Sequence, residues 1–244
     1  MNLIADIGNT TTKIAVVSDG KVVSKGRFGF TDMIGIEEFL SHYKCEKAII
    51  SSVKGMPEGF AETVGRFAEY VHILSRQSAI PFGIIYDTPE TLGMDRVAAV
   101  AGAYNKYSSS DVLVIDAGTA ITYDLLVNGK YEGGAISPGI EMRFKALNTF
   151  TGRLPLVEKN EKEISFPAKD TISGIRAGVI NGVVFEINEY IRNFEKYHAD
   201  NIVMITGGDS AYLCNLIGHK HIIEPDLVLL GLNNILEYNA YTKL

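Results

Sequence analysis

The segment Leu113–Thr119 (LVIDAGT) repeats the pattern of Leu3–Asn9 (LIADIGN), and the two copies lie 110 residues apart. In each copy a short apolar run ends in an aspartate, and a glycine follows two residues later. An apolar run that ends at a glycine turn is typical of a buried strand. The sequence therefore predicts two strands with the same polar end in the two halves of the chain.

The turns that follow also match. Asp19-Gly20 and Asn128-Gly129 are hairpin signals, because these residue pairs tolerate positive φ at both central positions. Each would return the chain into a further strand, over residues 22–28 and 131–137. Thr12 and Thr122 keep the 110-residue offset, whereas the hairpin turns are one residue closer, which indicates a one-residue deletion in the second copy.

Internal repetition of this kind predicts a duplicated α/β protein with mixed sheets. The expected domains are residues 1–110 and 111–244, the second of which would include a closing helix. Ligands favour clefts between such domains, so a cleft between the two halves is the expected binding site. Chance similarity remains the alternative, since an Asp-x-Gly turn after a strand is common.

The remaining pattern alternates strands with amphipathic segments. Further strands are expected over residues 47–53, 71–74 and 202–206. Expected helices cover residues 34–43, 60–70, 95–107, 140–147, 171–197, 210–216 and 226–239.

Composition narrows the function classes. The chain has 244 residues, 46% hydrophobic and 21% charged, which excludes wholesale disorder. The net charge of -6 argues against a surface that coats nucleic acid. No apolar run approaches the roughly 18 residues of a membrane span, and residues 1–6 lack a basic leader. Two distant cysteines suit a reducing compartment. We expect a cytoplasmic protein that binds neither nucleic acid nor membrane.

The loop Asp6–Thr11 offers successive backbone N–H groups and two hydroxyls, which is a cradle suited to phosphate. Asp6 would repel phosphate, so it fits better as an anchor for Mg²⁺ through bound water. Lys13 could add positive charge. An ordinary hairpin with an Asx-type turn would also account for the segment.

The second copy, Asp116–Ala120, predicts a second cradle in which Asp116 could hold a cation and Thr119 could meet a phosphate. Gly207-Gly208 ends another strand, and two glycines would let an adenine or ribose approach the backbone. A plain strand-to-helix turn is the alternative there.

A third group, Gly93-Met94-Asp95-Arg96, opens the Ala-rich helix. At a helix entrance Asp95 could accept a proton from a substrate hydroxyl, and Arg96 could clamp a carboxylate or a phosphoryl group. An acidic helix cap beside a solvated arginine is the alternative. Tyr86 could wall a pocket, and Thr171 stands at a helix start, where threonine is often an N-cap.

Taken in order, DIGNTTTK, GMDR, IDAGTAITYDL, EGGAISPG and TGGDS resemble the type III pantothenate kinases. That family belongs to the acetate and sugar kinase, Hsp70 and actin superfamily, whose members have two ribonuclease-H-like (actin-like ATPase) domains. The match runs from about Asp6 to Gly208.

The resemblance implies ATP-dependent phosphorylation of pantothenate to 4′-phosphopantothenate, the first step of coenzyme A synthesis. It implies that Asp95 accepts the proton and that Asp116 binds a monovalent cation, K⁺ or NH₄⁺. It also implies a homodimer. The pantothenate residues would be Tyr86, Gly93, Met94, Asp95, Arg96 and Thr171, the last across the dimer interface. With Gly207 and Gly208, the expected ATP residues are Asp6, Ile7, Gly8, Asn9, Thr10, Thr11, Thr12, Lys13 and Thr119.

Other functions remain open on the sequence. The chain could be a phosphotransferase acting on another small hydroxy acid or a polyphosphate hydrolase, although the GMDR clamp argues against hydrolysis. It could also be a nucleotide-sensing regulator without kinase activity, or an actin-like filament. The intact Asp95 and both cradles argue against a regulator, and 244 residues leave little room for polymerisation subdomains.

Overall fold

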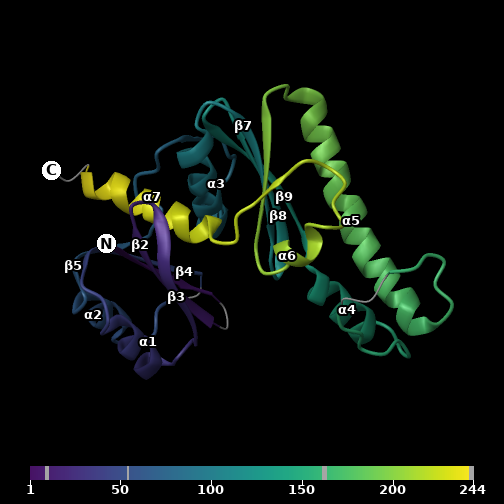
Figure 1. The fold of residues 1–244 in the computed structure, drawn as a ribbon, viewed down its shortest axis with the longest axis horizontal. Helices are drawn as coiled ribbons and strands as arrows, with labels where there is room; N and C mark the ends of the chain where they lie inside the picture. The colour runs from purple at the N-terminus through teal and green to yellow at the C-terminus, as the bar shows by residue number, and fades with distance from the viewer. Residues whose placement is uncertain (9–10, 54, 161–163, 242–244) are drawn as a thin grey trace. The chain divides into compact units, whose positions relative to one another are not determined.

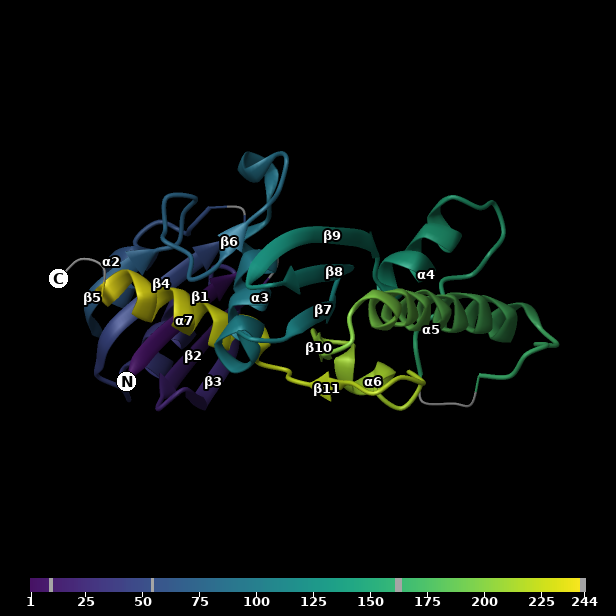
Figure 2. The ribbon, with the colours of Figure 1, turned by 90° about the horizontal axis from the view of Figure 1, so that it is seen from above.

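The computed structural model describes residues 1–8, 11–53, 55–160 and 164–241. The chain forms two compact units, and each contains one of the two repeated segments (Figure 1 and Figure 2). The first unit comprises Met1–Ser108, Gly129–Glu132 and Asp226–Leu244. The second comprises Ser109–Asn128 and Gly133–Pro225.

The first unit is built on a five-stranded sheet in the order β3-β2-β1-β4-β5. The hairpin strands β1, β2 and β3 are antiparallel, whereas β4 and β5 run parallel to β1. The sheet is therefore mixed, as expected. Its strands are β1 (Asn2–Ile7), β2 (Thr11–Ser18), β3 (Lys21–Gly29), β4 (Cys45–Ser52) and β5 (Ala68–Ile73).

Successive residues of β1 point to opposite faces of this sheet. Leu3, Ala5 and Ile7 face the buried cluster that α1 (Met33–Leu40) and α2 (Phe60–Gly65) complete. The residues between them point to the other face, along which α7 (Leu227–Tyr241) runs in Figure 2. Two helix layers therefore enclose the sheet, and Asp6 points to the α7 face.

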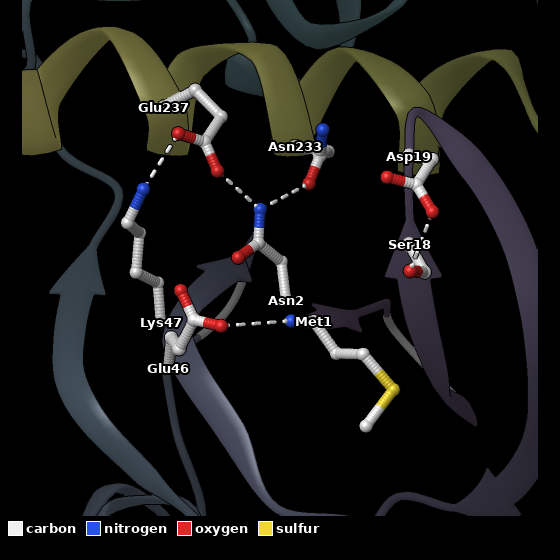
Figure 3. Close-up of polar contacts among 8 residues, drawn as sticks. All are labelled: Met1, Asn2, Ser18, Asp19, Glu46, Lys47, Asn233 and Glu237. Atoms are coloured by element: carbon white, nitrogen blue, oxygen red, sulfur yellow. Dashed lines mark hydrogen bonds and ion pairs between the residues drawn. The ribbon is translucent and has the colours of Figure 1, made fainter.

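Helix α7 is fixed to the sheet by polar contacts (Figure 3). The Asn2 amide donates hydrogen bonds to Asn233 Oδ1 (2.8 Å) and Glu237 Oε1 (2.5 Å), and Lys47 Nζ pairs with Glu237 Oε2 at 2.7 Å. Asn234 Nδ2 also donates to a backbone carbonyl of α3 (Met94–Tyr107) at 2.9 Å. These bonds place the last helix in the first unit. The division expected at residue 110 put it with the second half, because sequence order does not reveal which sheet a terminal helix covers.

The second unit repeats the arrangement of the first. Its strands are β7 (Asp111–Ala117), β8 (Ala120–Val127), β9 (Lys130–Pro138), β10 (Asn201–Thr206) and β11 (Ile222–Ile223). The sheet order is β11-β10-β7-β8-β9-β6. The strand β6 (Gly83–Ile84) pairs with Lys130 and Tyr131 at the start of β9, and these residues all belong to the first unit. As in the first sheet, the hairpin strands β7 and β8 are antiparallel and β10 is parallel to β7. The duplication predicted from the sequence is confirmed.

The helices of the second unit are α4 (Ile140–Thr149), α5 (Thr171–Tyr197) and α6 (Ser210–Leu213). The long helix α5 begins where Asp170 accepts a hydrogen bond from the Ser173 backbone N–H, and Ile180, Val183 and Ile187 lie in its buried face. Its predicted range, 171–197, is confirmed. A single-turn 3₁₀ helix (Pro89–Thr91) precedes α3 in the first unit.

Three helix predictions extended too far, and the first of them, over residues 34–43, ends at Leu40 in α1. Helix α2 ends at Gly65 rather than at residue 70, because Ala68–Tyr70 already pair with β4 in the sheet. Helix α6 ends at Leu213 rather than at residue 216. At these helix ends, contacts with the rest of the fold override the local helical pattern of the sequence.

The spacing between equivalent residues of the two copies also changes within the repeat. Ile7 pairs with Thr12 in the first hairpin, whereas Asp116 pairs with Thr122 in the second. The one-residue deletion thus lies in the loop after the repeated aspartate, and Thr12 and Thr122 are not structural equivalents.

Within the described part of the chain, no helix combines the length and the apolarity that crossing a bilayer would need.

Candidate functional site

The first group of predicted residues meets on the α7 face of the first sheet. Asp6 lies at the end of β1, directly opposite Lys13 of β2. Side chains directly opposite each other in an antiparallel pair lie on the same face. The carboxylate and the ammonium group are therefore presented together beside the loop that follows Asp6.

Asp95 approaches this pair from the first turn of α3. Its Oδ1 accepts a hydrogen bond from the Arg96 backbone N–H at 2.9 Å. A Cβ at Gly93 would overlap this oxygen, so the glycine makes room for the carboxylate at the helix entrance. The side chain itself is exposed, as a proton acceptor for a bound hydroxyl must be.

The pKa of Asp6 shows that the two carboxylates influence each other. Burial raises the pKa of Asp6 above its usual value, Lys13 lowers it, and the negative charge of Asp95 raises it further. The repulsion between Asp6 and Asp95 is the kind that a hydrated divalent cation relieves. The donor set therefore fits Mg²⁺ bound through water.

Arg96 is only 5% exposed. Its guanidinium lies 5.9 Å from the ring centroid of Tyr131, which is within the range of a cation–π contact. Tyr86 packs against the same ring, with a centroid separation of 6.0 Å. Two predicted substrate residues thus contact the same ring, that of Tyr131. The sequence analysis did not select Tyr131, because it looked like an ordinary residue of the strand expected over residues 131–137.

The described residues of the predicted phosphate loop make contacts of their own. The Gly8 N–H donates to the Thr11 carbonyl at 3.0 Å, and Arg27 Nε donates to Thr11 Oγ1 at 3.2 Å. Arg27 lies opposite Lys13 in the β2–β3 register and adds a second cation that the motif did not reveal. The predicted residues Asn9 and Thr10 lie outside the described residues.

Thr12 and Ile7 are fully buried. They form a directly opposed pair, so both point to the α1 and α2 face, away from Asp6 and Lys13. The Thr12 hydroxyl has no hydrogen-bond partner among the described residues. A side-chain contact of Thr12 with ATP does not fit this orientation.

In the second unit three loops converge at the end of β7. Gly207 has a φ of +92°, and a Cβ there would overlap Asp116 Oδ1 and the Ala117 carbonyl. The Gly118 N–H closes its turn on the Ala120 carbonyl at 3.0 Å. The predicted residues Asp116 and Gly207 are thus in contact, as a shared site requires.

The third loop contains Gly139, which the sequence analysis did not select as a site residue. Its N–H donates to the Thr119 carbonyl at 3.0 Å, and a Cβ there would overlap the carbonyl oxygens of Gly118 and Thr119. Thr119 remains exposed at the tip of its turn. Gly139 therefore packs directly against the turn that the DAGTA motif forms.

Asp209, which directly precedes α6, also contacts the end of β7. Its backbone N–H donates to the Ala117 carbonyl at 2.9 Å, and its carboxylate forms an ion pair with Lys159. Lys159 Nζ also lies 5.9 Å from the Tyr212 ring centroid. Gly208, the neighbour of Asp209, is exposed and has open space around it.

Thr171 is the first residue of α5 and is exposed. The N-cap is Asp170, so Thr171 does not serve the capping role that its type suggested.

Comparison with known proteins identifies relatives over the whole chain. The type III pantothenate kinase family matches residues 2–193. A type III pantothenate kinase of Porphyromonas gingivalis W83 is 42% identical over 243 residues, which cover 98% of this chain and 99% of the relative. That of Phocaeicola vulgatus is 42% identical over 242 residues, with 98% and 99% covered.

Solved structures share the fold at lower identity. A Campylobacter jejuni protein assigned to the Baf family of transcriptional activators has a TM-score of 0.64 at 24% identity, covering 98% of this chain and 99% of that one. A Sinorhizobium meliloti protein assigned as a 2-dehydro-3-deoxygalactonokinase has a TM-score of 0.58 at 14% identity, covering 98% and 99%. These likenesses confirm the sugar-kinase and actin-like fold. On the full-length identity to its relatives, this chain belongs to the type III pantothenate kinase family.

Proposed function

We propose that this protein transfers the γ-phosphoryl group of ATP to the primary hydroxyl of pantothenate and yields 4′-phosphopantothenate and ADP. The observation that carries the proposal is the placement of Asp95 and Arg96 at the entrance of α3, beside Asp6 and Lys13. A base, a clamp for an anion and a cation-binding carboxylate are the groups that such a transfer needs.

In the transfer, the hydroxyl oxygen of pantothenate forms a bond to the γ-phosphorus, and the bond from that phosphorus to the β–γ bridging oxygen breaks. The electron pair of the broken bond leaves with ADP, and Asp95 takes the hydroxyl proton. Arg96 would bind the pantothenate carboxylate, held in place by its contact with Tyr131. Tyr86 packs on the same ring and would line the pocket, together with Gly93 and Met94.

In the first unit, the segment after Asp6 would bind phosphate groups of ATP. In the second unit, taken by itself, Thr119, Gly207 and Gly208 would bind parts of the nucleotide. The N–H groups of Gly8 and Gly118 are used within their own turns, so the support here is that glycines let phosphate and ribose approach the backbone closely. Bound Mg²⁺ would supply charge neutralisation at the phosphates, with Asp6 as its anchor through water. Asp116 would supply a carboxylate oxygen for K⁺ or NH₄⁺, which its place at the convergence of three loops supports.

We also propose a cytoplasmic homodimer in which Thr171 reaches the pantothenate site of the second copy. Its exposure at the start of α5 supports this role. Subunits carrying Asp95→Asn can be combined with subunits carrying Thr171→Val. If Thr171 acts in trans, the mixed dimer contains one intact site and regains activity; if it acts within its own subunit, no activity returns.

The test of the function is ADP release with pantothenate, ATP and Mg²⁺, in K⁺ and in Na⁺ buffers. We expect turnover with pantothenate, higher in K⁺, and little turnover with other small hydroxy acids. An Asp116→Asn variant should lose the K⁺ stimulation. Turnover in wild type that does not depend on the monovalent cation would remove the role of Asp116.

A further inference from the structure

A polar network in the second unit centres on Glu186 of α5. Tyr123 Oη and Ser137 Oγ donate hydrogen bonds to Glu186 Oε1 at 2.7 and 2.5 Å. Arg143 Nη2 donates to Glu186 Oε2 at 2.6 Å. Three donors from β8, β9 and α4 thus meet on one carboxylate.

The network is mostly shielded from water. Tyr123 is 1% exposed, and the side chains of Arg143 and Glu186 are 21% and 25% exposed. Burial disfavours the Glu186 carboxylate, but the hydrogen bonds from Ser137, Arg143 and Tyr123 outweigh it and hold its pKa below the usual value. Burial and the nearby Glu186 raise the pKa of Tyr123. At neutral pH the carboxylate is therefore ionised and the phenol remains a donor.

Arg143 also bonds to the chain segment that precedes α4. Its Nε donates to the Pro138 carbonyl at 2.7 Å, and its Nη2 also donates to Ser137 Oγ at 3.2 Å. The Arg143 backbone N–H bonds to the Gly139 carbonyl at 3.0 Å. Side chain and backbone together fix the segment Ser137–Gly139.

Gly139 in turn touches the Gly118–Thr119 turn. The Gly139 N–H donates to the Thr119 carbonyl at 3.0 Å, and the two backbones are so close that a Cβ at Gly139 would overlap both carbonyl oxygens. A displacement of Gly139 must therefore displace the turn. Interiors packed this closely transmit small shifts.

We propose that Glu186 is a positioning residue: through Arg143 and Ser137 it holds Gly139 against the Gly118–Thr119 turn and so sets the geometry of the nucleotide cradle. The identity of the ligand as ATP rests on the proposed function; the chain of contacts does not. Glu186 itself touches no loop of the cradle in the described residues, so its effect is indirect.

The test is Glu186→Gln. Glutamine keeps the shape, but its amide NH₂ must face either Arg143 or the two hydroxyls, so a donor meets a donor. We expect the KM for ATP to rise about tenfold, as fits the loss of charge-assisted hydrogen bonds. The kcat and the KM for pantothenate should stay within about twofold of wild type. Hydrogen exchange at the Gly139 amide should become about tenfold faster.

Glu189→Gln is the matched control. Glu189 lies on the same helix, its side chain is 51% exposed, and its carboxylate bonds to Arg192 and Asn193 of that helix. Its kinetic constants and Gly139 exchange should equal those of wild type. A global effect of removing one charge from α5 would appear in this variant as well.

Arg143→Lys tests the link itself. Lysine keeps the positive charge near Glu186 but lacks the planar fork with which Arg143 uses separate nitrogens for Glu186 and Pro138. We expect the same rise in the KM for ATP as in Glu186→Gln, and no further rise in the double variant, because residues that act in series are not additive. Additive effects in the double variant would contradict the proposed chain.

A wild-type KM for ATP together with wild-type exchange at Gly139 in Glu186→Gln would overturn the proposal. A loss confined to kcat would also overturn it. If Glu186→Gln does not fold, Tyr123→Phe removes a single donor and should give a smaller rise in the same KM. If the wild-type protein does not phosphorylate pantothenate, the proposed function fails, and the Gly139 exchange and the binding of MgADP to the variants still decide the positioning role.

Discussion

Asp6 at the end of β1 and Asp95 at the start of α3 lie close enough for the charge of Asp95 to raise the pKa of Asp6. Burial is the larger cause of that rise, and Lys13 opposes it. The first unit thus gathers two carboxylates and a cation from three separate elements. Such an arrangement costs stability, and its natural explanation is a bound cation and phosphate.

Replacement of Asp95 by asparagine tests its role as the base. The asparagine oxygen can still accept the Arg96 N–H bond, so the helix start and the fold should remain. Without a proton acceptor, kcat should fall by about 10²–10⁴, the usual contribution of a general base. Steady-state ADP release measures this loss, and circular dichroism checks the fold.

Asp19→Asn is the control for that variant. Asp19 lies in the β2–β3 turn with a φ of +50°, and the second hairpin has Asn128 in the same conformation. Asparagine therefore fits the turn, and turnover should equal that of wild type. Wild-type turnover in Asp95→Asn would exclude Asp95 as the base.

Arg96→Lys should weaken pantothenate binding more than ATP binding. Lysine keeps the charge, but it loses the planar fork and the stacking on Tyr131. The KM for pantothenate should rise about tenfold or more, as when a charge-assisted hydrogen bond is lost. Separate titrations of the two substrates give this comparison, and an equal effect on both KM values would contradict the assignment.

Gly207→Ala should destabilise the second unit. Its φ of +92° disfavours any side chain, and the new Cβ would overlap Asp116 and Ala117. The cost should be at least about 1 kcal/mol. Gly208→Ala is the matched control for stability, because open space surrounds that position. Thermal unfolding of the two variants should differ, and equal melting temperatures would contradict this account of the loop.

Glu237→Gln should loosen α7 from the first sheet. Burial disfavours the Glu237 carboxylate, but hydrogen bonds from Lys47 and Asn2 hold its pKa below the ordinary value of 4.5. A lowered folded-state pKa stabilises the protein above about pH 4.5, and this contribution is lost as the pH falls below it. At pH 7 the variant should lose about 1–2 kcal/mol.

Urea unfolding near pH 7 and near pH 3.5 measures this dependence. The gap between wild type and Glu237→Gln should narrow at the lower pH, where the carboxylate becomes protonated. Glu46→Gln, whose exposed side chain pairs with the N-terminus in Figure 3, should change little at either pH. A gap that widened toward acid would contradict the assigned contacts.

Much of the fold could be predicted because its signals are local. The repeated strand ends at Asp6 and Asp116, and the turns at Asp19-Gly20 and Asn128-Gly129, follow directly from backbone preferences. The range of α5 was also correct, since its cap and its apolar spacing lie within one continuous segment.

What the sequence could not reveal depends on contacts between distant segments. The place of α7 in the first unit rests on bonds from Asn2 and Lys47, far away in the chain. The orientation of Thr12 away from Asp6 follows from the strand register, which a shorter loop in the second copy obscured.

Among the predicted site residues, Asp95 lies near Asp6 in the first unit, and Gly207 lies against Asp116 in the second. Their roles stay predictions. Tyr131 and Gly139 were not selected, because each acts through a neighbour in space. The contact of Tyr131 with the Arg96 guanidinium and that of Gly139 with the Gly118–Thr119 turn join segments far apart in the chain. No local sequence pattern indicates such contacts.

The most direct test of the central claim is the product formed from pantothenate and MgATP by the purified wild-type protein. Mass spectrometry of the reaction should show 4′-phosphopantothenate in equal amount to the ADP released, and both products should form at least about 100-fold more slowly in Asp95→Asn. ADP released without phosphorylated pantothenate, or no reaction of wild type in K⁺ buffer, would contradict the account.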